Sequence, residues 1–437
     1  MIMCRINRFH VYLWIVLCMF CMKVSAQSVQ ERLNAIIQNA DIQKLNRFLP
    51  QVKDSLDDMT RNVAEGYLHS GMNRPDLAFK CYDNLIKQYS ATYDMTDYVC
   101  VAVREQINMG LYKEAKQYTE RFFYKDTLQQ GVKIPFPDGH PLRDDYNIAY
   151  SLQDCDPSKI VRTSGKPTRI ERSKAENGFW IIPGIANHGA QENFILDTGC
   201  TYNMVSEDFA YRHSIQSFAD SIEIPGVTEV AFAKIGFIDS ITIENMVYQN
   251  VQVLILPSIA PVLQSRLGFA IDAILGIPFL KAVGTVELYP QKGRMVFPIV
   301  DESIKPNMQS NLSVLDFMRV EIGIGPIKRM LAMLDSGCDC FMMGKSLYDT
   351  YSKDFQQYDF QKKNLGIAGM TGEIDTIHVW VPKKNVPIKI GATRIKYKDV
   401  LVTESTNIGQ REILGKGVIN SLRKVVIDLK AMTFVAN

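Results

Sequence analysis

The chain has 437 residues, of which 46% are hydrophobic and 22% are charged, a balance typical of globular proteins of about two to four domains. Its 49 basic and 47 acidic residues nearly cancel, so the charge gives no electrostatic reason to expect a nucleic-acid partner, and none is predicted. A core of this size can form without disulfides.

Residues 1–26 are predicted to be a signal peptide. Arg5 and Arg8 form a basic start, residues 11–22 are apolar, and Val24–Ala26 provides the small residues that a signal peptidase cuts. The apolar stretch is shorter than the roughly 20 residues of a membrane span. We therefore expect an exported protein, periplasmic or secreted, with no membrane span after signal cleavage. An uncleaved N-terminal anchor is the alternative.

Residues 27–125 are predicted to form a helical domain. Two stretches within it share the same order of features: a small residue, a turn glycine, a second small residue and an aromatic residue. The glycine, second small residue and aromatic residue are Gly71, Ala78 and Tyr82 in the first stretch and Gly110, Ala115 and Tyr118 in the second. This pattern resembles degenerate tetratricopeptide-type repeats, about two in number, which can bind a protein partner. A plain bundle of helical hairpins is an equally open interpretation.

Residues 126–176 are expected to be a linker or an irregular bridging segment. Prolines and a glycine interrupt the pattern among charged and polar residues, at Pro135, Pro137, Pro141, Pro157, Gly165 and Pro167. Such residues break regular helices and strands.

From residue 177 onward the spacing predicts strands. Apolar or alternating runs occupy residues 179–182, 192–196, 240–248, 251–256, 317–322, 330–334, 377–381 and 400–403, and β-rich tails occupy residues 284–297 and 424–435. The predicted fold class is multidomain α plus all-β: N-terminal helical hairpins followed by two homologous β-rich lobes, residues 177–304 and 305–437.

Two triplets give this region its functional signal: Asp197-Thr198-Gly199 and Asp335-Ser336-Gly337. Each follows an apolar run and precedes a cysteine, Cys200 or Cys338. About 80 residues after each aspartate comes an Ile-Leu-Gly segment, 274–276 or 413–415, and such matched sequels indicate an internal repeat. The repeat would bring one carboxylate from each copy to a shared centre.

Two neighbouring carboxylates share one proton, because both cannot easily ionise. The ionised one can take a proton from water while the protonated one donates to a scissile carbonyl, so that water attacks a peptide bond without a covalent intermediate. Gly199 and Gly337 suit the tight turns required. Thr198 and Ser336 supply hydroxyls that can hydrogen-bond to the opposite loop. The Ile-Leu-Gly segments would be strands beneath the loops, with glycine permitting close backbone approach.

These motifs resemble those of the aspartic peptidases, in a pepsin-like arrangement of two retropepsin-like units covering about residues 178–437. The resemblance implies that Asp197 and Asp335 are the catalytic pair, that Thr198 and Ser336 brace the two loops, and that the substrate is a peptide or protein. No cofactor or metal is expected. One chain carries both triplets, so a monomer should suffice for the site.

The chain departs from the family pattern at Cys200 and Cys338, where the family usually has a small Ser, Ala or Thr. Candidates for a substrate-covering flap are residues 366–372 and, more weakly, 225–227.

The alternative function is a non-catalytic peptide- or protein-binding envelope protein that keeps the peptidase fold, or an assembly factor of such an envelope. A cysteine nucleophile at Cys200 would need a histidine partner. The histidines also show no His-Glu-x-x-His pattern.

Overall fold

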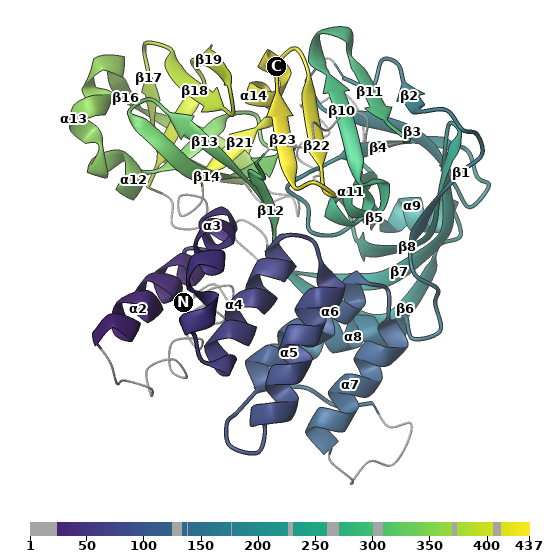
Figure 1. The fold of residues 1–437 in the computed structure, drawn as a ribbon. Coiled ribbons are helices and arrows are strands. Elements are labelled where there is room, and N and C mark those ends of the chain that lie inside the picture. The colour runs from purple at the N-terminus through teal and green to yellow at the C-terminus, as the bar shows by residue number, and fades with distance from the viewer. Residues whose placement is uncertain are drawn as a thin grey trace. The chain divides into compact units, whose positions relative to one another are not determined.

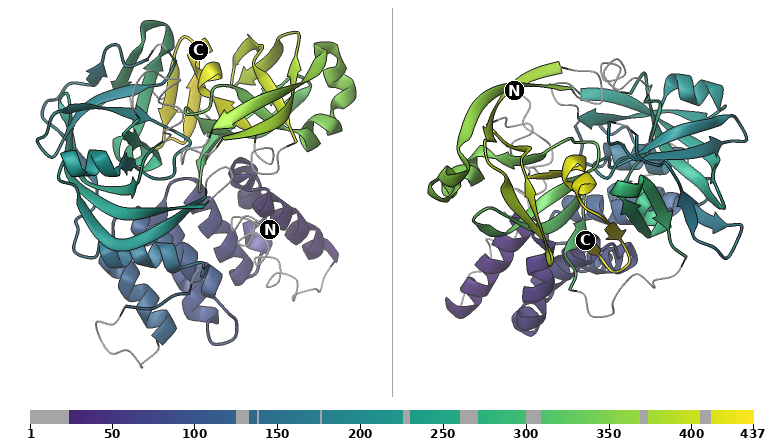
Figure 2. Two further views of the ribbon diagram at one scale, coloured as in Figure 1. Left: turned by 180° about the vertical axis from the view of Figure 1, so that it is seen from behind. Right: turned by 90° about the horizontal axis from the view of Figure 1, so that it is seen from above.

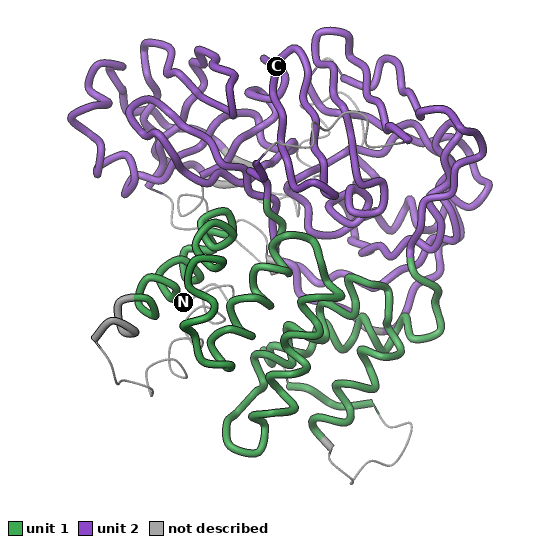
Figure 3. Tube along the Cα trace, viewed as in Figure 1, with its two compact units in different colours: residues 1–157, 313–315 green, residues 158–312, 316–437 purple. Residues whose placement is uncertain are grey.

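The computed structural model describes residues 24–124, 133–137, 139–175, 177–225, 230–259, 271–299, 309–368, 374–404 and 412–437. The chain divides into two compact units, residues 1–157 with 313–315 and residues 158–312 with 316–437 (Figure 3). The first is helical, and the second consists mainly of strands (Figure 1). The predicted mixed α and β multidomain class is therefore confirmed.

The first unit is a series of helices in which successive members pack on one another. They are α2 (Val24–Gln38), α3 (Ile42–Val52), α4 (Asp58–Gly71), α5 (Pro75–Tyr89), α6 (Thr96–Asn108), α7 (Tyr112–Tyr124) and α8 (Arg143–Ser151), with a 3₁₀ turn at Lys53–Ser55. The starts of two helices follow from local chemistry, because the side chains of Asp41 and Asp57 accept hydrogen bonds from the first turns of α3 and α4. Strand β12 (Leu312–Val314) returns to this unit, where Val314 pairs with Met72.

The expectation of an irregular linker over residues 126–176 is wrong for much of that range. It contains α8 and two strands, β1 (Lys159–Arg162) and β2 (Thr168–Ile170). Helix α8 forms because the side chains of Tyr146, of Ile148 and of Leu152 at its C-terminal cap are completely or almost completely buried. This tertiary packing stabilises the helix more than the prolines nearby in the sequence destabilise it. The two strands gain partners that are distant in sequence, β8 and β11.

Residues 1–23, most of the predicted signal peptide, lie outside the described residues. Within the described ranges, no helix combines the length and the apolar character that a membrane span requires. Export therefore stays a prediction.

The second unit contains a sheet in the order β1-β8-β5-β9-β4-β3-β7-β6, and β7 also pairs with β8, so the sheet curls back on itself. The strands after β1 are β3 (Ile181–Ala186), β4 (Gln191–Leu196), β5 (Met204–Ser206), β6 (Gln216–Pro225), β7 (Val230–Ile243), β8 (Met246–Leu256) and β9 (Ala273–Leu275). Short helices α9 (Glu207–Arg212) and α11 (Ile277–Val283) follow β5 and β9.

A second sheet, drawn in green to yellow in Figure 2, has the order β16-β17-β20-β15-β21-β14-β13-β18-β19. Its strands are β13 (Met318–Ile324), β14 (Ile327–Asp335), β15 (Phe341–Gly344), β16 (Phe360–Ala368), β17 (Ile374–Pro382), β18 (Val386–Ile390), β19 (Thr393–Tyr397), β20 (Val400–Thr403) and β21 (Ile413–Gly415). Helices α12 (Lys345–Thr350), α13 (Ser352–Phe355) and α14 (Lys416–Ser421) lie between or after them, with a 3₁₀ turn at Gln356–Tyr358.

The pairings around the two triplets repeat from one sheet to the other. Strand β4 runs parallel to β9 and β14 runs parallel to β21. Strand β5 is antiparallel to β9, and β15 is antiparallel to β21. The internal repeat read from the sequence is therefore a repeat of strand connectivity as well.

A third sheet, β2-β11-β10-β22-β23, contains strands from the ends of both predicted lobes. It contains β10 (Thr285–Tyr289), β11 (Arg294–Phe297), β22 (Val425–Asp428) and β23 (Thr433–Ala436), with a 3₁₀ turn at Pro290–Lys292. The two β-rich tails predicted from the sequence thus pair with each other, β10 against β22. The predicted boundary between lobes, at residues 304 and 305, lies outside the described residues.

Candidate active site

Each aspartate of the two triplets stands at the end of a buried strand. Residues 194–196 of β4 and 332–334 of β14 are buried, so both strands are anchored in their sheets. Asp197 follows β4 directly, and Asp335 is the last residue of β14. Both aspartates are neither fully buried nor fully exposed, so most of each residue is withdrawn from water while part of its surface stays accessible.

Backbone amides of each turn hold the carboxyl group of the same triplet. Asp197 Oδ1 accepts a hydrogen bond from Gly199 N–H at 2.9 Å. Asp335 Oδ1 accepts one from Gly337 N–H at 2.9 Å and a second from Cys338 N–H at 3.1 Å. These bonds fix the direction of both carboxyl groups and favour their ionised form.

The hydroxyls of the two triplets interlock. Thr198 Oγ1 donates to the Leu334 carbonyl at 3.0 Å and accepts from Ser336 N–H at 2.9 Å. Ser336 Oγ donates to the Leu196 carbonyl at 2.9 Å and accepts from Thr198 N–H at 2.9 Å. Both side chains are only 1% exposed. The four bonds tie the two loops together in a place where a missing partner could not be replaced by water.

The glycines of the triplets bring each carboxyl group against the opposite loop. A Cβ added to Gly199 would lie 2.6 Å from Asp335 Cγ, and one added to Gly337 would lie 2.7 Å from Asp197 Oδ2. Only glycine leaves room for such contacts. The structure therefore brings all six predicted site residues together, with the two carboxyl groups as neighbours.

Gly276 and Gly415 close the space beneath the loops. A Cβ on Gly276 would collide with the carbonyl oxygens of Cys200 and Tyr202, and one on Gly415 with those of Cys338 and Cys340. The close approach expected from the two Ile-Leu-Gly segments is therefore confirmed.

Gly276→Ala should destabilise the protein by about 1–3 kcal/mol, because the blocking atoms belong to the backbone and cannot rotate away. Unfolding in urea measures this loss. Gly165→Ala is the matched control, since nothing lies within 4 Å of a Cβ placed there. Equal stability of the two variants would contradict the packing described.

Burial and mutual repulsion make the carboxyl pair retain protons. Burial, followed by the charge of Asp335, raises the pKa of Asp197 to about 7, although nearby amides and Lys416 oppose the change. Burial also raises the pKa of Asp335. Two neighbouring carboxyl groups whose pKa values are both raised carry a single proton between them over part of the acid-to-neutral range.

Lys416 is a charged neighbour that the sequence reasoning missed. Its side chain is 3% exposed, pairs with Asp339, and places Nζ 3.8 Å from the ring centre of Phe179. Its positive charge lowers the pKa of both Asp197 and Asp335. The available signal was an asymmetry of the repeat: a lysine follows Ile413–Gly415, whereas Ile277 follows the first Ile-Leu-Gly segment.

Cys200 has none of the surroundings of a thiol nucleophile. Burial raises its pKa well above the usual range, and its Sγ donates to the Tyr202 carbonyl at 3.0 Å. His213, a buried histidine that follows Cys200 in the sequence, has its Nε2 atom 3.1 Å from Glu192 Oε1. The expected flap hairpins correspond to β6–β7 and β16–β17, but their turns, residues 226–229 and 369–373, lie outside the described residues.

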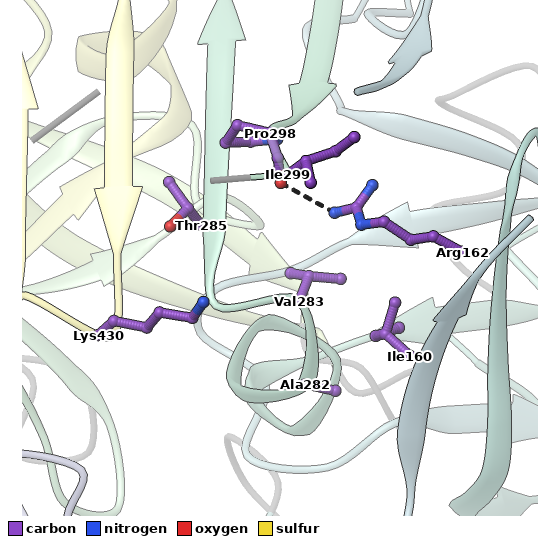
Figure 4. A pocket seen from close by; sticks show the side chains of 8 residues that line it. All are labelled: Ile160, Arg162, Ala282, Val283, Thr285, Pro298, Ile299 and Lys430. Carbon is purple, nitrogen blue, oxygen red and sulfur yellow. Dashed lines mark hydrogen bonds between the residues drawn. The ribbon is translucent and has the colours of Figure 1, made fainter. Parts of the chain in front are cut away.

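A separate pocket of about 350 Å³ is lined by Ile160, Arg162, Ala282, Val283, Thr285, Pro298, Ile299 and Lys430 (Figure 4). The guanidinium of Arg162 donates to the carbonyls of Phe297 and Pro298 and to Thr168 Oγ1. None of the six triplet residues lines this pocket. Across the described part of the chain, no group of three or more His, Cys, Asp or Glu side chains has a metal-binding arrangement.

A family model described as aspartyl protease matches residues 182–279. The match contains the first triplet and the first Ile-Leu-Gly segment, and it supports an aspartic-peptidase relationship for that part of the chain. No curated protein matches. A retropepsin-like aspartic protease from Rickettsia conorii aligns at 14% identity over 32% of this chain and 91% of its own, with a TM-score of 0.22. Basic 7S globulin from soybean aligns at 11% identity over 64% of this chain and 96% of its own, with a TM-score of 0.37.

Proposed function

We propose that the chain is an exported aspartic endopeptidase whose site consists of Asp197 and Asp335. The observation that carries this proposal is the interlock of the two triplets, in which Thr198 and Ser336 each bond to the opposite loop. A single triplet could be an ordinary turn. Two triplets locked together, with each carboxyl group packed on the other's glycine, form an arrangement that a shared-proton pair requires.

In the proposed reaction, the pair begins with one proton. The ionised carboxylate removes a proton from a water molecule, and that water attacks the carbonyl carbon of the peptide bond. The protonated carboxyl group donates its proton to the carbonyl oxygen, which gives a neutral gem-diol. When the diol collapses, the C–N bond breaks and the amine leaves with the proton that the first carboxylate took from water. A hydroxyl proton of the diol returns to the second carboxylate, so the pair again holds one proton. The amides of Gly199, Gly337 and Cys338 keep the carboxylate oxygens aligned throughout.

The substrate of this site is a peptide or protein segment, and one copy of the chain supplies both aspartates. The helical unit would serve to recruit substrates or protein partners. A purely peptide-binding role would leave the same loops without turnover, so cleavage itself has to be measured. Incubation of the purified protein with a mixture of unstructured peptides, followed by mass spectrometry, should reveal new termini within chains as well as at their ends. Binding of peptides without any new termini would favour the non-catalytic role.

The activity should fall as the pH rises through about 7, because the pair then loses the proton that the carbonyl oxygen needs. The expected fall in kcat/KM is about tenfold per pH unit on that side. Rates from pH 3 to pH 9 with one fixed peptide measure the profile. A rate that keeps rising above pH 8 would contradict a shared proton.

The same pKa predicts the direction of a stability change. The folded pKa of Asp197, about 7, exceeds the unfolded value of about 3.9. A raised pKa contributes stability that is fully present below the unfolded value and is lost as the pH rises through the folded value. Asp197→Asn should therefore lose less stability than the wild type between pH 4 and pH 8, as measured by thermal unfolding. An identical pH dependence for both proteins would count against the raised pKa.

A further inference from the structure

Two cysteine thiols lie side by side on the loop that follows Asp335. The Sγ atoms of Cys338 and Cys340 are 4.0 Å apart and within sulfur hydrogen-bonding distance. Both cysteines are free and partly exposed. Neither thiol has a part in the proposed hydrolysis.

The backbone between the two cysteines allows them to be joined. Residues two apart span at most about 7 Å when extended, and the chain bends at Asp339 and Cys340. Disulfides connect Cα atoms separated by roughly 4.4–6.8 Å. The sulfurs need to close to about 2 Å, and that movement must be absorbed by side-chain rotation and by the loop.

The loop is fixed to the carboxyl pair on one side and to helix α14 on the other. Cys338 N–H donates to Asp335 Oδ1 at 3.1 Å, while the Cys338 carbonyl accepts from Lys416 N–H at 2.7 Å. The Asp339 carbonyl accepts from Gly417 N–H at 3.1 Å. A shift of the loop therefore changes the hydrogen bond by which the Cys338 N–H aligns the Asp335 carboxyl group.

We propose that Cys338 and Cys340 form a modification site that a small-molecule disulfide of the glutathione class oxidises to an internal disulfide, which inactivates the carboxyl pair. One cysteine thiolate attacks a sulfur of the small disulfide, forms a mixed disulfide and releases one small thiolate. The other cysteine thiolate then attacks the protein sulfur of that mixed disulfide and releases the second small thiol. The two cysteines lose two protons and two electrons, and the small disulfide is reduced to two thiols.

The surroundings of the thiols indicate the order of attack. The hydrogen bond with Cys340, together with burial, raises the pKa of the Cys338 thiol well above its usual range. A thiol held protonated is a poor nucleophile, so Cys340 attacks first. Once Cys340 carries the small thiol, that hydrogen bond is lost and Cys338 is freer to ionise.

The first half of the repeat supplies a matched comparison. Cys200 occupies the position of Cys338 but is 3% exposed, and Tyr202 stands where Cys340 stands in the second half. Cys200 Sγ bonds to the Tyr202 carbonyl instead of to a second thiol. The first loop therefore has no internal pair to oxidise, and Cys200→Ala is the control for the variants of the second loop.

The test incubates the reduced protein without the predicted signal peptide, residues 27–437, with oxidised glutathione and follows intact mass, peptide maps and peptidase rate. The wild type and Cys200→Ala should each lose about 2 Da through a Cys338–Cys340 bond and at least about tenfold in rate, both restored by dithiothreitol. Cys340→Ala and Cys340→Ser should keep their rate under the same treatment. Thermal unfolding of both variants checks that they fold.

Three results would each overturn the proposal: a stable glutathione adduct on Cys338 or Cys340, an unchanged mass, or a Cys338–Cys340 disulfide that leaves the rate unaltered. The link to activity rests on the proposed peptidase function, whereas the mass and the peptide map do not. A wild type that forms the disulfide but never cleaves peptides would therefore refute the peptidase function and, with it, inactivation by the disulfide. The same protein would still retain a verified oxidation site.

Discussion

Asp197→Asn and Asp335→Asn should each lower kcat/KM by at least about a thousandfold, because general acid–base catalysis of this kind contributes roughly 10²–10⁴ and both roles pass through the pair. Asparagine keeps the shape of aspartate, and its side-chain oxygen can still accept from Gly199 N–H or Gly337 N–H. It cannot share a proton or remove one from water. The measurement is the steady-state rate on one peptide at the pH of maximal activity.

The control for these variants is Asp239→Asn, which changes an exposed carboxylate of β7 and should leave the rate unchanged. Folding is checked separately by thermal unfolding at pH 8. There the asparagine variants should be at least as stable as the wild type, since each removes one of two crowded carboxylates. Wild-type rates in either asparagine variant would exclude the proposed chemistry.

The second large effect should come from the interlock. Thr198→Val keeps the side-chain volume but removes the hydroxyl, leaving the Leu334 carbonyl and Ser336 N–H without their partner in a buried place. Each unsatisfied buried group costs about 1–3 kcal/mol, so a stability loss of roughly 2–4 kcal/mol is expected. We also expect the rate to fall at least about a hundredfold, because a small displacement of reacting groups has an effect of that size.

Ser336→Ala should behave in the same way, and the double variant should lose less than the sum of the two, since both residues belong to one network. Thr201→Val provides the comparison on the same loop: its hydroxyl reaches the Asp316 carbonyl at 3.2 Å in an exposed place and should matter little. Urea unfolding and peptide rates on the wild type and all four variants measure these effects. Additive losses, or a loss in Thr201→Val equal to that in Thr198→Val, would contradict the interlock.

The sequence predicted those parts of the site that depend on short-range chemistry. An aspartate after an apolar strand, a hydroxyl beside it and a glycine next to that leave few backbone arrangements, and Asp197–Gly199 and Asp335–Gly337 follow them closely. Gly276 and Gly415 were readable for the same reason, because glycine after an apolar strand signals close backbone approach. The repetition of these features made the pairing of the two loops predictable.

Other features depend on partners far away in the sequence. Strand β1 looks like part of a polar linker until Ile160 is placed opposite Tyr248 of β8. The sheet that joins β10 to β22 pairs Val286 with Ile427, and no local pattern specifies such a partner. The surroundings of Lys416 also depend on partners that are distant in sequence. Only the folded chain places its charge beside Asp339 and over Phe179.

The proposed mechanism uses two aspartates, one from each half of the chain, to activate water against a peptide bond. Its most direct test is digestion of a peptide mixture in water enriched in ¹⁸O, by the wild type and by a double variant carrying Asp197→Asn and Asp335→Asn. We predict new carboxyl termini that each carry one solvent oxygen with the wild type, and none with the double variant. New termini in equal amount from both proteins, or from neither at any pH between 3 and 8, would exclude this mechanism.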